Sequence, residues 1–221
     1  MIIRGVVFDV DGVLIDTEHY QWKGWVEPLK KYGKVLDKEA YIKSYAGKTG
    51  AVIDRELIEA MRLSLTPGTL LREKEVLLLE WFRSDELKFL PYTREAIRFV
   101  QERRYAFAAV SGAPREETQL KLQRTGLSFP HTITSDDVQH SKPAPDPYLL
   151  ALRKLDLPAN QCIAVEDTQY GVESAVGAGI PTLAIPTEFS ASQDFSKATA
   201  VLTSLKEVCE WIEENARTRI S

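Results

Sequence analysis

The sequence has few of the residues that define several large classes of protein. It contains two cysteines in 221 residues, Cys162 and Cys209, which excludes a disulfide framework or a cysteine-ligated metal cluster and favours a reducing compartment. It also lacks an excess of basic residues, because 28 Lys and Arg face 32 Asp and Glu, for a net charge of −4. Proteins that bind the nucleic-acid backbone normally show a clear basic excess, so we do not expect nucleic acid as a partner.

Long hydrophobic runs are absent too. The chain begins with MIIRGVVF, a short apolar stretch interrupted by Arg4, without the longer apolar region and cleavage site of a secretory signal. No later apolar run approaches the ~18 residues that a membrane span requires. With 44% apolar and 27% charged residues, the composition is that of an ordinary globular protein. We expect a soluble cytoplasmic protein with no membrane partner; a monomer is compatible with the sequence, which leaves the oligomeric state open.

Short apolar segments alternate with helical patterns along much of the chain. Residues 5–10, 106–110, 162–165 and 182–185 are apolar without period-two alternation, which is typical of strands buried on both faces. Helical patterns cover residues 93–104, residues 114–125, where Pro114 is expected in the first turn and Gly126 after the end, and a C-terminal segment from Leu205. The alternation predicts an α/β fold with a doubly wound, parallel, Rossmann-like sheet.

Residues 17–87 interrupt this alternation. They contain no convincing buried strand and divide into four helical segments at Gly33, Gly47 and residues 66–68. We therefore expect an α-helical cap domain at 17–87, inserted into a core domain formed by residues 1–16 and 88–221.

An acidic motif follows the first expected strand. Asp9 and Asp11 lie two residues apart, and Gly12 comes next. Side chains two residues apart in a strand point to the same side, and two neighbouring carboxylates need a cation unless one keeps its proton. Both outcomes are chemically useful, because divalent cations take oxygen ligands and a protonated carboxyl can act as a general acid.

Two later strands also end in polar residues. Ser111 and Gly112 precede Pro114, which places a hydroxyl and backbone N–H groups at a helix N-terminus, where an anion is favoured. Glu166 and Asp167 place two more carboxylates at the end of another strand. Open α/β sheets bind ligands at the carboxyl ends of their strands, so we expect these residues in one site with the first acidic pair.

A lysine completes the expected site. Lys142 lies in the segment SKPAPD, whose prolines restrict the backbone and fix the lysine better than an ordinary loop would. The four carboxylates require a metal to offset their charge. Together with Mg²⁺ and the Ser111 loop, Lys142 could hold a phosphoryl group, whose transfer depends on positioning and charge neutralisation.

The order of the segments FDVDGVLIDTE, VSG, SKPAPDPY and AVEDTQYGVESAVGAG resembles the haloacid dehalogenase superfamily over nearly the whole chain. The resemblance is closest to the branch with a helical cap inserted after the first strand, which includes phosphoglycolate phosphatase-like enzymes and β-phosphoglucomutase. It implies that Asp9 is the nucleophile that forms an aspartyl-phosphate and that Asp11 is the general acid and then the base. Haloacid dehalogenases proper lack a carboxylate at the position of Asp11, so its presence favours phosphate chemistry.

The resemblance also assigns roles to the remaining polar residues. Ser111 and Lys142 would hold the phosphoryl oxygens. The ligands of Mg²⁺ would come from Asp9, Asp167 and the backbone carbonyl of Asp11, with Glu166 supporting the metal site.

Substrate contacts are expected from the cap and from the loop beside the phosphate. We expect them from Gly112, Lys48, Gln21, Trp25 and Arg115. The mutase pattern has a histidine where this chain has Gln21 and an asparagine where it has Arg115. It also has an arginine at the position of Gly50 in this chain.

These departures favour hydrolysis over the mutase reaction. We expect a Mg²⁺-dependent phosphatase for a small phosphorylated metabolite, either a sugar phosphate or a phosphoglycolate-like acid. A phosphosugar mutase is the nearest alternative. A non-enzymatic phospho-aspartate signalling module is a further one, although it predicts a phosphoacceptor on the third strand and no insert.

Overall fold

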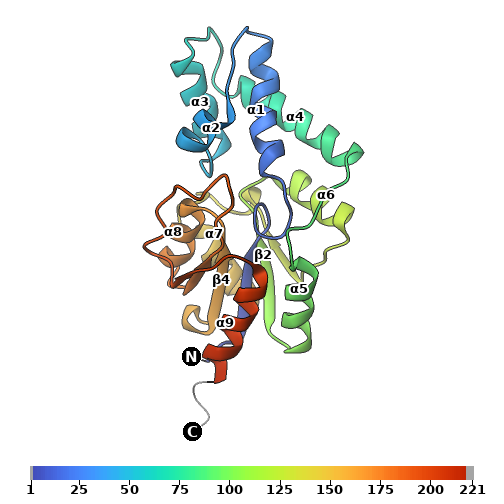
Figure 1. Ribbon diagram of the computed structural model, residues 1–221, viewed down its shortest axis with the longest axis vertical. Coiled ribbons are helices and arrows are strands. Elements are labelled where there is room, and N and C mark those ends of the chain that lie inside the picture. Colours follow the sequence, from blue (N-terminus) through green and yellow to red (C-terminus); the bar gives the residue numbers. More distant parts are fainter. Residues whose placement is uncertain (1, 218–221) are drawn as a thin grey trace.

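The computed structural model describes residues 2–217 and consists of a parallel α/β core with a group of helices stacked at one end (Figure 1). The core lies below in the view of Figure 1, and the helices that follow the first strand lie above it. Within the described part of the chain, no helix is long and apolar enough to cross a membrane.

The core contains one parallel sheet of six strands in the order β3-β2-β1-β4-β5-β6. The chain builds outward from β1 to β3, then returns to the other side of β1 and builds outward again to β6. The order therefore reverses beside β1, where open sheets of this kind bind their ligands. The predicted doubly wound parallel sheet is confirmed. Its strands are β1 (Gly5–Asp9), β2 (Ala106–Val110), β3 (His131–Ile133), β4 (Cys162–Glu166), β5 (Thr182–Ala184) and β6 (Ala200–Val201).

Helices cover both faces of the sheet. In β1, Val6 and Phe8 pack into one hydrophobic core and Val7 into the other, because successive side chains of a strand point to opposite faces. The first core also receives side chains from α5 (Thr93–Glu102), α6 (Arg115–Thr125) and α9 (Leu205–Arg217), and the second from α7 (Asp146–Leu155) and α8 (Gln169–Gly177). The short 3₁₀ helices η1 (Ser135–Asp137) and η2 (Ala159–Gln161) lie in the connections.

Four helices lie between β1 and α5, in agreement with the four helical segments that the sequence predicts. They form a hydrophobic cluster of their own around Trp25, Leu29, Leu57 and Leu70, which Phe189 of the core also joins. Helix α4 additionally contacts α6 of the core. The inserted helices are α1 (Glu18–Lys30), α2 (Lys38–Ser44), α3 (Gly50–Ala60) and α4 (Thr69–Ser84).

Three local features differ from the sequence prediction. Strands β3 and β6 are not predicted, because they span only three and two residues, and two of the three residues of β3, His131 and Thr132, are polar. Helix α6 begins at Arg115, so Pro114 precedes the first helical residue instead of lying in the first turn. Its other end agrees with the prediction, since Gly126 closes the helix with a φ of 70°.

Candidate active site

The acidic residues of the site come from two neighbouring strands. Asp9 is the last residue of β1. Glu166 is the last residue of β4, and Asp167 follows it; β4 pairs with β1 in parallel. One carboxylate oxygen from each of these three residues lies within 4.8 Å of the others. All three side chains are buried, so their charges are poorly screened by water.

This cluster fits a divalent cation. The Oδ2 atom of Asp167 is buried and has no hydrogen-bond partner among residues 2–217. Burial raises the pKa of Asp9 and of Asp167 well above the ordinary range, and nearby carboxylates, including Glu166, raise both further. Since Mg²⁺ takes carboxylate oxygens and would offset this repulsion, the donor set suits a magnesium ion.

Lys142 reaches the same carboxylates from the loop before α7. Its Nζ contacts Asp9 and lies 2.5 Å from Oε1 of Glu166, an oxygen that also accepts a hydrogen bond from the Tyr148 hydroxyl. Burial alone would lower the pKa of Lys142, but Asp9 and Glu166 raise it above its ordinary value. The lysine is therefore a fixed cation. Oε1 of Glu166 already accepts hydrogen bonds from Lys142 and Tyr148. Asp9 and Asp167 are therefore better placed than Glu166 to offer oxygen atoms to a metal.

The carboxylate of Asp11 is held by three side-chain donors. Its Oδ1 accepts hydrogen bonds of 2.5 Å from Thr17 and from Lys121, and its Oδ2 accepts one of 3.0 Å from Ser111. Burial raises the pKa of Asp11, but the charge of Lys121 and these hydrogen bonds outweigh it and leave the pKa below its ordinary value. The geometry therefore favours the carboxylate form of Asp11.

The loop after β2 contributes Ser111 and Gly112 to the same region. Besides bonding to Asp11, the Ser111 hydroxyl accepts a hydrogen bond of 3.1 Å from the backbone N–H of Ala113. Gly112 lines the cavity, and no atom lies within 4 Å of the place that a Cβ on this glycine would take. The backbone at Gly112 is thus open to a ligand.

A cavity of about 320 Å³ lies between the core and the inserted helices. The core supplies its acidic floor, including Asp9, Asp11 and Asp167, together with Lys142. The expected substrate contacts Gly112, Gln21, Trp25 and Lys48 also line it, and Lys48 forms an ion pair of 2.7 Å with Glu56.

Arg115 does not join these residues. Its guanidinium pairs with Asp137 of η1, its backbone N–H donates to Asp136 at 2.9 Å, and it does not line the cavity. These contacts do not support the expected contact between Arg115 and the substrate. Helix α6 directs this side chain toward the loop after β3.

Sequence reasoning missed two buried lysines of this region. Lys121 is completely buried and pairs with both Asp11 and Glu117. Lys74 lines the cavity, donates a hydrogen bond of 2.6 Å to Oε1 of Gln21 and lies 5.2 Å from the ring centroid of Trp25. In the sequence, Glu117 and Lys121 show only an i, i+4 charge pair, which is typical of an exposed helix face; no signal indicates their burial.

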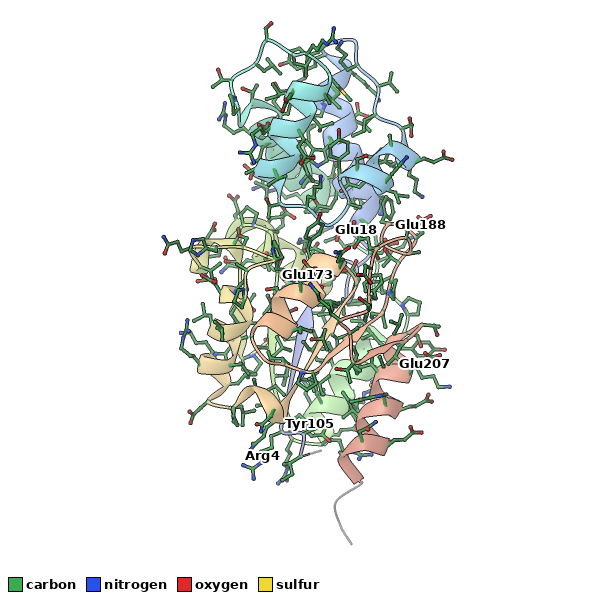
Figure 2. The ribbon with its side chains drawn as sticks, turned by 90° about the vertical axis from the view of Figure 1, so that its left-hand side faces the viewer. Arg4, Glu18, Tyr105, Glu173, Glu188 and Glu207 are labelled. Atoms are coloured by element: carbon green, nitrogen blue, oxygen red, sulfur yellow. The ribbon has the colours of Figure 1, made fainter. Side chains whose placement is uncertain are left out.

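Sequence reasoning also missed Glu18, the first residue of α1. Figure 2 shows it at the junction between the inserted helices and the core, and its side chain lines the cavity. Burial, and next the charge of Asp11, raise the pKa of Glu18 to about 7, against the opposing effect of Lys74 and Lys121. A carboxyl that titrates near neutral pH therefore faces the ligand space.

Residues 6–185 match the model of the haloacid dehalogenase-like hydrolases, so the chain is a member of that family and the resemblance seen in the sequence is confirmed.

Its relatives narrow the class to phosphoric monoester hydrolases. Fructose-1-phosphate phosphatase YqaB of Escherichia coli K12 is 32% identical over 80% of this chain and 93% of the relative. A phosphorylated carbohydrates phosphatase of Thermotoga maritima is also 32% identical, over 80% and 82%. The crystal structure of CbbY from Rhodobacter sphaeroides in complex with phosphate matches with a TM-score of 0.82 at 25% identity, covering 93% of this chain and 96% of that one.

Proposed function

We propose that the protein is a Mg²⁺-dependent phosphatase that hydrolyses a small phosphorylated metabolite, a sugar phosphate or a phosphoglycolate-like acid, through an aspartyl-phosphate on Asp9. The observation that carries the proposal is that Asp9 lines the cavity together with Asp11 and Lys142, with the Lys142 Nζ in contact with the Asp9 carboxylate. The names of the two 32%-identical relatives, both phosphatases of phosphorylated sugars, support it.

In the first step, a carboxylate oxygen of Asp9 attacks the phosphorus, and the bond from phosphorus to the leaving oxygen breaks. Asp11 must first take up a proton, because Lys121 and the hydrogen bonds to Asp11 favour its carboxylate form. It then gives this proton to the leaving oxygen, so an alcohol leaves and Asp11 becomes a carboxylate again. Lys142 and the loop at Ser111 bind the phosphoryl oxygens. Mg²⁺ bound by Asp9, Asp167 and the Asp11 carbonyl, with Glu166 in support, would offset the repulsion between the carboxylate nucleophile and the phosphate.

In the second step, the Asp11 carboxylate takes a proton from water while the water oxygen attacks the phosphorus. The bond between phosphorus and Asp9 breaks, inorganic phosphate leaves, and both aspartates return to the states they had at the start of the attack on the ester. The carboxylate form of Asp11, which Lys121 favours, is the form that this step requires.

The cavity suits a small substrate. Its volume of about 320 Å³ lies near the lower end of the range for small-molecule sites, which is roughly 300–1,000 Å³. The inserted segment would act as a cap and supplies two lysines, an amide and an indole to the cavity: Lys48, Lys74, Gln21 and Trp25. These groups can bind hydroxyl or acid groups on the part of the substrate that remains after phosphate leaves.

The test is to trap the phosphoenzyme. The purified chain is mixed with Mg²⁺ and a phosphate ester labelled on phosphorus, quenched in acid and digested, and the labelled peptide is identified. We expect the label on Asp9 in the unsubstituted chain. The variant Asp9→Asn should take up no label and should not hydrolyse the ester. Asp156→Asn is the matched control, because Asp156 is an exposed residue at the end of α7, with a φ of 52° that asparagine also tolerates.

Three outcomes would contradict the proposal. Mg²⁺-dependent hydrolysis that survives in Asp9→Asn would exclude Asp9 as the nucleophile. Phosphorus NMR separates the remaining cases: free phosphate indicates the phosphatase, an isomerised sugar phosphate indicates the mutase, and a long-lived acyl phosphate without turnover indicates a signalling module.

A further inference from the structure

A completely buried lysine contacts Asp11 from outside the cavity. Lys121 of α6 has no exposed surface, and its Nζ lies 2.5 Å from Oδ1 of Asp11 and 2.9 Å from Oε1 of Glu117. It is not among the residues that line the cavity. A buried ammonium is strongly unfavourable unless it is paired, so the two carboxylates hold Lys121 in one position, and Lys121 in turn holds Asp11.

The same lysine is linked to the inserted helices. Oε1 of Glu117 also accepts a hydrogen bond of 3.3 Å from Nε2 of Gln21 on α1, and Oε1 of Gln21 accepts one of 2.6 Å from Lys74 on α4. The ring of Phe82, also on α4, has its centroid 5.6 Å from the Lys121 Nζ. A continuous polar chain thus runs from Asp11 in the core to Lys74 in the cavity wall.

We propose that Lys121 is a positioning residue for Asp11. It fixes the Asp11 carboxylate at the α6 side of the site, and the contacts through Glu117 keep Lys121 in place while the inserted helices are packed on the core. The proposal rests on the proposed function, because it concerns the proton transfers of Asp11. Lys121 does not touch the substrate, so its loss slows the steps that need Asp11 and leaves substrate binding nearly unchanged.

The two chemical steps can be separated by the choice of substrate. An aryl phosphate with an acidic phenol loses its phenolate without needing a proton, so phosphorylation of Asp9 does not depend on Asp11. Hydrolysis of the aspartyl-phosphate still depends on Asp11, because the attacking water must be deprotonated. Rapid-quench measurement of phenol release and of inorganic phosphate release in a single turnover gives the two rates independently.

The variant Lys121→Met keeps most of the side-chain length and removes the charge. We expect phenol release to stay within about threefold of the unsubstituted chain, while phosphate release falls by about 100-fold, the typical contribution of a positioned acid or base. The labelled phosphoenzyme should then accumulate, and the Kd for the substrate, taken from the concentration dependence of single-turnover phenol release, should change by less than about threefold. Lys197→Met is the matched control: Lys197 is exposed, pairs with Glu173 at 2.8 Å, and should leave both rates unchanged.

A second variant covers the case in which Lys121→Met fails to fold. Lys121→Met/Glu117→Gln removes one charge of each sign from the buried group, and it should show the same selective loss of phosphate release. Equal loss of both rates, or no loss of either in the folded variant, would overturn the positioning role. Absence of any protein-bound phosphate in the unsubstituted chain would instead contradict the proposed function.

Discussion

The carboxylate of Asp167 occupies the space that a side chain at Gly12 would need. A Cβ placed on Gly12 would lie 2.1 Å from Oδ2 of Asp167, and the φ of Gly12 is +77°. Gly171 stands in the same relation to Glu166, since its Cβ would lie 1.9 Å from Oε2 of that residue. Both carboxylates that β4 contributes to the acidic cluster therefore depend on a glycine beside them.

Gly12→Ala should weaken the metal site as well as the fold. The new methyl group must displace the Asp167 carboxylate, so we expect Mg²⁺ affinity to fall by about 10-fold, the lower end of the effect of disturbing groups that orient metal ligands. Overpacking of about 1–3 kcal/mol adds to the backbone strain. Mg²⁺ titration of activity and thermal unfolding measure the two effects.

Gly33→Ala separates backbone strain from the contact with Asp167. Gly33 also has a positive φ, of +64°, but no atom lies within 4 Å of its Cβ position. Alanine there should cost only the left-handed strain of about 1–2 kcal/mol and should leave Mg²⁺ affinity unchanged. Equal Mg²⁺ affinity in both variants would show that Gly12 does not make room for the cluster.

Mg²⁺ binding should strengthen as pH rises. Burial raises the pKa of Asp9 and Asp167 well above the ordinary value, which is about 3.9 for aspartate, and a bound cation requires both as carboxylates. Between the ordinary and the raised pKa, the folded metal-free chain holds more protons than the unfolded chain, so its stability falls with rising pH. The increase in melting temperature on adding Mg²⁺ should therefore be larger at high pH.

Asp167→Asn tests the origin of this pH dependence. It removes one of the two raised carboxyls, so the unsubstituted chain should show a steeper dependence of Mg²⁺-induced stabilisation on pH than the variant. Calorimetric Mg²⁺ titrations at several pH values check the same trend. Affinity that is independent of pH in the unsubstituted chain would mean that neither carboxyl holds a proton in the metal-free state.

The acidic residues of the site could be predicted from the sequence because they lie at the carboxyl ends of predicted strands. Short apolar runs indicate buried parallel strands, and the residues that follow them meet at one edge of the sheet. Asp9 and Asp167 are brought together in this way by the pairing of β1 with β4. Lys142 lies on a loop and not at the end of a strand, so its prediction depended on the prolines that restrict this loop.

The surroundings of α6 could not be predicted, because the helix has no clear apolar face. Its sequence, REETQLKLQRT, is polar almost all around, yet Glu117 and Lys121 are buried while Arg115 is exposed. The packing of α4 against α6 decides which charges are covered. That contact joins segments far apart in the chain, and no local pattern in either helix indicates it.

Arg115→Ala should leave catalysis unchanged. The guanidinium pairs with Asp137 outside the cavity and is about half exposed, so we expect kcat/KM to stay within about twofold and stability to fall by no more than about 1 kcal/mol. Lys48→Met is the contrast, because Lys48 lines the cavity; its loss should raise KM by about 10-fold, or about 1.4 kcal/mol of binding. A large rise in KM for Arg115→Ala would indicate that Arg115 contacts the substrate.

Glu18→Gln should remove a pH dependence from substrate binding. Burial and the neighbouring Asp11 raise the pKa of Glu18 to about 7, so the group is neutral below that pH and a carboxylate above it. Because it lines the cavity, its negative charge should repel an anionic phosphate ester, and KM of the unsubstituted chain should rise as pH increases through about 7. The variant, which stays neutral, should lack this rise.

The ratio of KM for the unsubstituted chain to KM for Glu18→Gln separates the ionisation of Glu18 from that of the substrate. A phosphate ester itself titrates near pH 6, but that ionisation is the same for both proteins and cancels in the ratio. Glu188→Gln is the control, because Glu188 is an exposed carboxylate near the same junction and pairs with Lys38 at 2.8 Å (Figure 2). The KM ratio of the unsubstituted chain to Glu18→Gln should increase across pH 7, whereas the ratio to Glu188→Gln should stay flat; a flat ratio for both would place the Glu18 charge out of reach of the bound phosphate.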